Sequence, residues 1–89
     1  MVKEVLACRK LTQGLSWIMA QPDIEKVMLN LEELYDISAC SGNTEETRII
    51  SGLIDRRENV AILNERLRKG RGITYERLVQ AAECEISEG

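Results

Sequence analysis

The stretch that most strongly indicates the fold of this chain is TEETRIISGLIDRRENVAILNERLRK, residues 44–69. Its apolar side chains keep heptad register, which is typical of one face of an amphipathic helix. They are Ile49, Leu53, Val60, Leu63 and Leu67, with Arg56 in the slot where a further apolar residue is expected. Gly70 follows three basic residues, as at a helix C-terminus closed by a left-handed glycine. The stretch therefore predicts one long helix over residues 44–69, about 39 Å in length at 1.5 Å per residue.

Shorter helices are predicted on both sides of this stretch. Apolar residues recur at spacings of three and four over residues 3–20, 22–39 and 74–86. Pro22 separates the first two of these segments, because proline disfavours helix at the preceding residue and is tolerated in a first turn. Small and polar residues over 38–43 predict a loop, after which Asn43 or Thr44 is expected to cap a helix, and Asn43 and Glu46 have the spacing of a capping box. Thr74 is expected to cap the last helix.

These elements predict an all-α fold in a single domain spanning residues 1–89. We expect a small bundle of three to four helices with one long central helix, over about 44–69. Aromatic residues make up only 3% of the chain, which favours an aliphatic core of packed helices. At 89 residues the chain buries only about 60–65% of its unfolded surface, so we expect a second copy to enlarge the core as a homodimer.

Charge and cysteine content restrict the compartment and the class of ligand. The net charge of −3 gives no global attraction to nucleic acid or to anionic membranes. The sequence has no apolar run long enough for a transmembrane helix and no apolar signal-peptide core at its N-terminus. Cys8, Cys40 and Cys84 are odd in number and far apart, which favours free thiols in a reducing cytosol. We therefore expect a cytoplasmic protein that does not associate with membranes.

No residue pattern predicts catalysis, a cofactor or a metal site. The chain contains no histidine, so it lacks the usual general base near neutral pH and the commonest metal ligand. The adjacent acids Glu32–Glu33 and Glu45–Glu46 point about 100° apart on a helix and do not converge. Gly70-Arg71-Gly72 lacks the lysine and the preceding strand of a phosphate loop. The sequence therefore favours a protein that is not an enzyme.

The helices carry more apolar residues than one packed face requires. Leu6 and Trp17 project from nearly the opposite side of their helix to Cys8, Leu11, Leu15 and Ile18. Tryptophan anchors protein interfaces more often than most residues do. On the long helix, Ile50, Ile54 and Ala61 form a second apolar stripe about 100–140° from the heptad face. Four helices leave room for one of these two patches to be covered within the chain itself.

Arg56 and Gly52 are two anomalies on the predicted long helix. An arginine in the heptad seam is costly unless it is paired, and Asp55 or Glu58 of a second copy is expected to pair with Arg56 at a symmetric interface. Gly52 lowers helix stability by about 1 kcal/mol relative to alanine, which indicates a close approach of another helix. The predicted protein interface therefore comprises Leu6, Trp17, Ile50, Ile54 and Arg56.

The leading hypothesis is a non-enzymatic regulator or inhibitor that binds a partner protein, such as a transcription factor or a nucleic-acid enzyme. Its size, acidity, helicity and lack of active-site residues are similar in style to the small helical regulators carried by phages and other mobile elements. A basic segment supports an alternative, a DNA- or RNA-binding regulator that contacts phosphates. This segment comprises Arg66, Arg68, Lys69 and Arg71. A second alternative is an accessory subunit or chaperone with the same helical architecture.

Overall fold

The computed structural model describes the backbone of residues 2–86 and the side chains of residues 10–86. The described chain folds entirely into helices and connecting turns, without a β-strand. The five helices are α1 (Val2–Met19), α2 (Ile24–Cys40), α3 (Thr44–Asp55), α4 (Arg57–Arg68) and α5 (Tyr75–Glu83). The radius of gyration is 12.1 Å, close to the value of about 12 Å expected of a compact domain of this length. The prediction of an all-α fold is confirmed.

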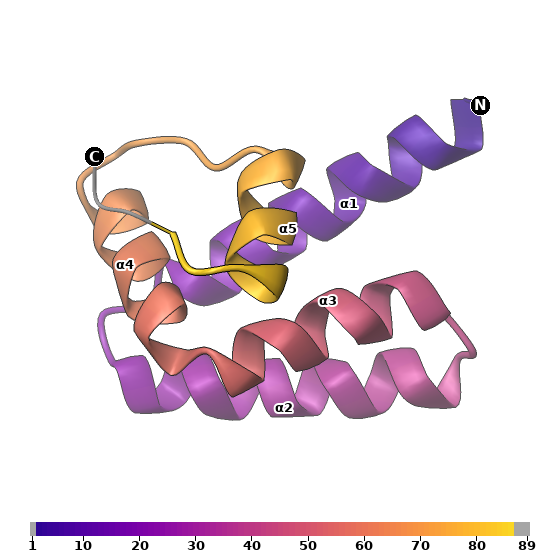
Figure 1. Cartoon of the computed structure of the whole chain (residues 1–89), viewed down its shortest axis with the longest axis horizontal. Coiled ribbons are helices and arrows are strands. Elements are labelled where there is room, and N and C mark those ends of the chain that lie inside the picture. Colours follow the sequence, from indigo (N-terminus) through magenta and orange to yellow (C-terminus); the bar gives the residue numbers. More distant parts are fainter. Residues whose placement is uncertain (1, 87–89) are drawn as a thin grey trace.

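The prediction of one long helix over residues 44–69 is wrong, because the helix breaks at Arg56. Arg56 has φ −117° and ψ 66°, outside the helical region, and it separates α3 from α4. In Figure 1, α4 turns sharply away from the line of α3. The Arg56 carbonyl then accepts hydrogen bonds from the N–H groups of Asn59 and Val60, which begin the new helix. Residues 2–86 therefore contain five helices of 9 to 18 residues, and the predicted long helix is two helices of 12 residues each.

The ends of the helices follow local capping. Asp23 caps α2 by accepting from the Glu25 N–H at 3.0 Å, so this helix begins after Pro22 and not at it. Asn43 accepts from the Glu46 N–H and Thr74 from the Arg77 N–H, both at 3.2 Å, as the sequence predicts for these two caps. The loop between α2 and α3 is shorter than predicted, because α2 continues to Cys40. The last helix ends at Glu83 and not at residue 86, because Cys84 is extended.

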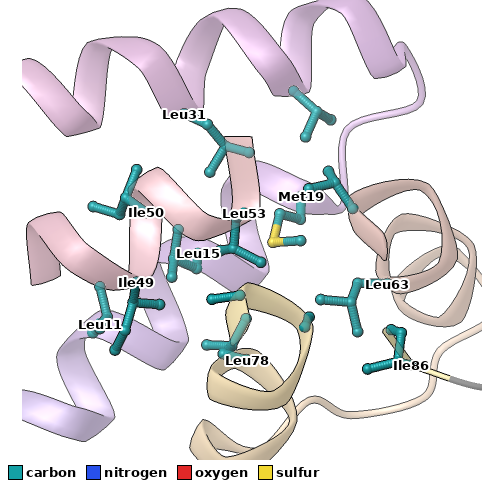
Figure 2. Packing of buried hydrophobic residues seen from close by; sticks show 14 residues of the cluster. Leu11, Leu15, Met19, Leu31, Ile49, Ile50, Leu53, Leu63, Leu78 and Ile86 are labelled. Atoms are coloured by element: carbon teal, nitrogen blue, oxygen red, sulfur yellow. The ribbon is translucent and has the colours of Figure 1, made fainter. Parts of the chain in front are cut away.

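The core is a single aliphatic cluster to which all five helices contribute (Figure 2). Helix α3 lies at its centre and packs against α2 on one side and α5 on the other. Four residues of the predicted heptad face, Ile49, Leu53, Val60 and Leu63, are fully buried. The other core members are Leu11, Leu15, Met19, Val27, Leu31, Ile50, Leu78, Ala81, Ala82 and Ile86. The sequence pattern thus identified the core positions of α3 and α4, although it missed the turn between these two helices.

Helices α3 and α5 approach each other most closely at Gly52. A Cβ atom added to Gly52 would lie 2.2 Å from the Ala82 carbonyl oxygen and 2.9 Å from the Ala82 Cβ. Such distances are well inside van der Waals contact, so only glycine allows α5 to lie here. The predicted close helix approach at Gly52 is confirmed.

Two buried asparagines of α4 donate hydrogen bonds to carbonyl groups at the C-termini of other helices. Asn59 is buried and donates to the carbonyls of Ala81 at 2.8 Å and Cys84 at 2.9 Å. Asn64 is also buried and donates to the carbonyl of Met19 and to that of Gln21 at 2.7 Å. Because the last carbonyls of a helix lack partners within it, these amides stabilise the ends of α5 and α1.

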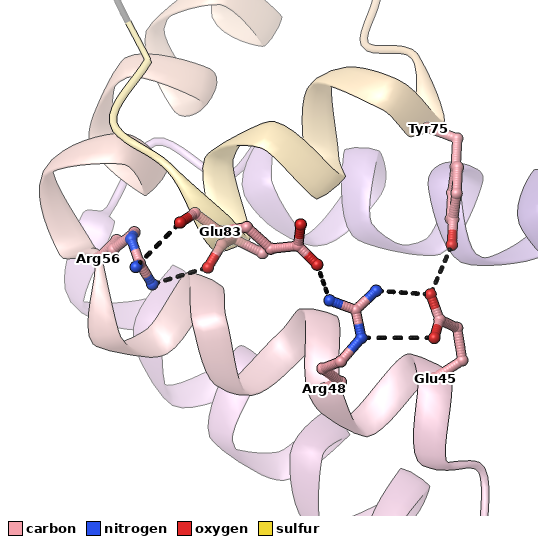
Figure 3. Close-up of polar contacts among 6 residues, drawn as sticks. Glu45, Arg48, Arg56, Tyr75 and Glu83 are labelled. Atoms are coloured by element: carbon pink, nitrogen blue, oxygen red, sulfur yellow. Dashed lines mark hydrogen bonds and ion pairs between the residues drawn. The ribbon is translucent and has the colours of Figure 1, made fainter.

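Arg56 completes the same arrangement on α5 (Figure 3). Its guanidinium donates to the carbonyl of Ala82 at 2.7 Å and to that of Glu83 at 3.2 Å. A cation is also favoured at the negative end of the helix dipole. The arginine in the heptad seam therefore has hydrogen-bond partners within the same chain, and it needs no Asp55 or Glu58 of a second copy to be paired.

Candidate interaction surfaces

Trp17 lies on the solvent side of α1. Its exposed fraction is 71%, whereas Leu11, Leu15 and Met19 of the same helix are buried in the core. Around the helix axis, Trp17 points roughly 160° away from the mean direction of these three residues. Leu6 falls at nearly the same angle as Trp17 by its spacing, but its side chain lies outside the described residues. The outer face of α1 therefore presents one large aromatic side chain to solvent.

Two further apolar side chains are exposed on α2. Leu29 and Ile37 have exposed fractions of 59% and 62%. They lie on the outer side of α2, away from the buried Val27 and Leu31. Neither residue was named as a surface candidate from the sequence, although helical spacing alone separates both from the core side. At 100° per residue, Leu29 lies about 160° and Ile37 about 120° from Leu31 around the helix axis.

The predicted second stripe is only partly covered within the chain, and its last member, Ala61, is exposed on α4. Ile50 is fully buried between the helices, so it is not accessible to a partner in this monomer. Ile54 is half-buried and lines an open hollow of 350 Å³ between α2 and α3. Tyr35 and Ser51 line this hollow and also a neighbouring one of 410 Å³. The structure thus separates Ile50 from Ile54, which sequence spacing placed on one face.

The basic segment gathers at the C-terminus of α4 and the turn after it. Arg66, Lys69 and Arg71 line a small pocket of 100 Å³ together with Ile62 and Glu65. Arg68 is exposed and does not line the pocket. Gly70 has φ +81°, as predicted for a left-handed glycine that closes the helix. The four basic residues of the nucleic-acid alternative are therefore neighbours, and three of them converge.

A separate charged network ties α3 to α5 (Figure 3). The Arg48 guanidinium pairs with the Glu45 carboxylate at 2.8 Å and also contacts the Glu83 carboxylate. The Tyr75 hydroxyl donates to Glu45 at 3.2 Å. The hydrogen bond from Arg48, its positive charge and the hydrogen bond from Tyr75 all lower the pKa of Glu45. Solvent-exposed pairs of this kind contribute little to stability, and we regard the network as structural.

The lowered pKa of Glu45 predicts a pH-dependent contribution to stability. Because its folded pKa is below the unfolded value, the Glu45 carboxylate stabilises the fold above about pH 4.3 and loses this effect as the pH falls through the folded pKa. Glu45→Gln should lower the melting temperature at pH 7 by a few degrees, and the difference from the native chain should shrink as the pH falls through the folded pKa of Glu45. Glu33→Gln, at an exposed acid on α2, is the control and should leave the melting temperature unchanged. A Glu45→Gln difference that persists in acid would contradict this assignment.

Among the described residues, the cysteine and acidic side chains form no converging cluster. Cys40 and Cys84 are exposed free thiols, and the Cys8 side chain lies outside the described residues. Within the described part of the chain, no three cysteine, aspartate or glutamate side chains lie close enough together to hold a metal ion. Over the same residues, no helix combines the length and apolar character needed to cross a membrane.

Comparisons with known proteins give no relative for this chain. No family model matches the sequence, and neither the curated proteins nor the solved structures contain a match. A functional assignment therefore rests on the surfaces described above.

Proposed function

We propose that this chain is a non-enzymatic protein-interaction module, a small helical regulator or inhibitor that binds a partner protein through the outer face of α1. The observation that carries the proposal is the 71% exposure of Trp17. Covering the exposed part of a tryptophan contributes about 3–4 kcal/mol at 25 cal/mol per Å². A protein partner of the kind expected from the sequence, a transcription factor or a nucleic-acid enzyme, would supply that cover with an apolar groove or helix.

The outer face of α1 also suits a second copy of the chain, so we propose that the chain forms a homodimer through this face. In an antiparallel pair of α1 helices centred between positions 6 and 17, Trp17 of each copy lies opposite position 6 of the other. Such an isologous contact repeats the apolar pairing twice. Light scattering should then give a mass of about 20 kDa, twice the 10.1 kDa of one chain. A mass of one chain at all concentrations would exclude the dimer but not the hetero-partner.

Trp17→Ala tests the proposal directly. We expect the substitution to weaken binding by more than 1 kcal/mol, about fivefold or more in the dissociation constant. Because Trp17 is exposed in the monomer, the free energy of unfolding should change by no more than about 0.5 kcal/mol. The measurement is the affinity for a partner captured from the native host, together with the dimer dissociation constant from sedimentation.

Leu29→Ala and Ile37→Ala are matched controls, since they remove similarly exposed apolar side chains from α2 instead of α1. Both should leave binding within about twofold of the native chain, as peripheral positions do. Unchanged affinity and mass for Trp17→Ala, or losses confined to the α2 variants, would place the interface elsewhere and refute the role of Trp17.

A further inference from the structure

The pocket at the end of α4 owes its shape to the turn at Gly70. The Gly70 N–H donates to the Leu67 carbonyl and the Arg71 N–H to the Arg66 carbonyl, each at 3.0 Å. These bonds, with the positive φ of Gly70, fold the chain back on the last turn of α4. Arg71 is thereby held beside Arg66, five residues earlier in the sequence. The local backbone therefore brings Arg66, Lys69 and Arg71 to one pocket of 100 Å³.

Arg66 has an unmet hydrogen-bonding requirement. Its Nε atom is buried and has no acceptor within the described residues. Buried donors in native proteins nearly always have a partner, so an orphaned one calls for a ligand or a bound solvent molecule. Arg66 lines the pocket, whereas its neighbour Arg68 is exposed and does not. The missing acceptor is therefore at the one arginine of α4 that contributes to the pocket.

The charges around the pocket are mostly uncompensated. Glu65 is the acid in its lining and pairs with Lys69 at a separation of 3.5 Å. Among the described residues, neither Arg66 nor Arg71 forms an ion pair. The negative end of the α4 dipole opposes an anion here, but the carbonyls of Glu65, Arg66 and Leu67 already accept hydrogen bonds from the turn. Two free guanidinium groups therefore outweigh the local negative charge.

We infer that this pocket binds a single phosphate group. Arginine presents a planar set of N–H donors that matches the oxygens of phosphate, and neither Arg66 nor Arg71 has a carboxylate partner among the described residues. A pocket of 100 Å³ is large enough to admit one tetrahedral oxyanion. The two sources that share this chemistry are free phosphate or a phosphomonoester and the backbone of a nucleic acid.

A phosphate titration followed by nitrogen-15 NMR tests the inference on the full chain. Sodium phosphate replaces sodium chloride at constant ionic strength, so that general screening does not change. We expect saturable shifts of the Arg66 Nε–Hε signal and of the Arg71 and Gly72 amide signals, with a millimolar dissociation constant. Shifts that stay linear with phosphate concentration, or an Arg66 Nε–Hε signal that does not move, would overturn the proposal.

Variants of single basic residues distinguish binding in the pocket from general electrostatic attraction. Arg71→Gln lies in the exposed turn and should weaken phosphate binding by about tenfold, as expected for the loss of a charge-assisted pair. Arg66→Lys keeps the charge but removes the planar donor set, so it should also weaken binding. Arg68→Gln removes the same charge from the same helix end outside the pocket and should change binding less than about twofold. Equal losses in Arg68→Gln and Arg71→Gln would show diffuse attraction and refute a pocket.

A second titration with a single-stranded DNA dodecamer assigns the source of the phosphate. Shifts of the same Arg66 Nε–Hε signal at a lower concentration of dodecamer than of inorganic phosphate would support a nucleic-acid backbone as the ligand. If phosphate saturates the signal and the dodecamer leaves it unmoved, a free phosphate or phosphomonoester is supported. Neither result depends on Trp17, so the phosphate site and the protein interface at Trp17 can each be refuted without affecting the other.

Discussion

Replacing Gly52 by alanine is expected to destabilise the fold by about 2–4 kcal/mol, against the normal preference of a helix for alanine. The added Cβ would lie 2.2 Å from the carbonyl oxygen and 2.9 Å from the carbonyl carbon of Ala82. Both are backbone atoms, so no side-chain rotation relieves the overlap, and α3 and α5 must separate. That separation would open the centre of the core, where Leu53 and Leu78 are fully buried. Urea denaturation followed by far-UV circular dichroism measures the loss.

Gly14→Ala is the matched control, because the same change has the opposite sign there. Gly14 lies inside α1, and a Cβ added to it meets no atom within 4 Å. Alanine at this position should therefore stabilise the chain by about 0.5–1 kcal/mol through helix propensity and a less flexible unfolded state. Similar free energies of unfolding for the two variants would show that α3 and α5 do not approach as closely as the structure indicates.

The core could be predicted from sequence because its signal is local. Ile49, Leu53, Val60 and Leu63 repeat with helical spacing, and this spacing places them on one face whatever they pack against. The break at Arg56 could not be predicted in the same way. The heptad register continues through it, and no glycine or proline marks it. The partners that hold Arg56 out of the helix are carbonyls of Ala82 and Glu83, which lie far along the chain.

The same difference between local and distant causes explains which surface residues could be predicted from the sequence. The spacing of α1 correctly placed Trp17 away from the core, because one helix has one buried side. For α3 the spacing left open whether Ile50 meets a neighbouring helix or another chain, and the structure buries it within the chain, where α3 packs against both α2 and α5. The phosphate pocket lay within the predicted basic segment, but its orphaned Arg66 Nε depends on the turn geometry and has no sequence signal. The sequence therefore identified the apolar and basic segments more reliably than it identified which of their side chains are exposed.

The second large effect is expected from Asn64→Asp, which changes one donor group into an acceptor. The Asn64 side-chain amide donates to the carbonyls of Met19 and Gln21, in a buried position between α4 and the end of α1. A carboxylate there has no proton to donate and faces two carbonyl oxygens. We expect a loss of about 3–5 kcal/mol at neutral pH, the range for an uncompensated buried charge. The measurement is urea denaturation at a series of pH values.

The pH dependence distinguishes this cause from a loss of packing. Burial and the facing carbonyls should raise the pKa of the new carboxyl above its ordinary value of about 3.9. The penalty is then complete above that raised pKa and shrinks as the pH falls through it, because a protonated carboxyl donates one hydrogen bond. Asn43→Asp is the control: Asn43 accepts from the Glu46 N–H at 3.2 Å, and aspartate serves equally well as such a cap, within about 0.5 kcal/mol. An Asn64→Asp loss that is small, or that does not change with pH, would mean that α4 is not joined to α1 through donation by this amide.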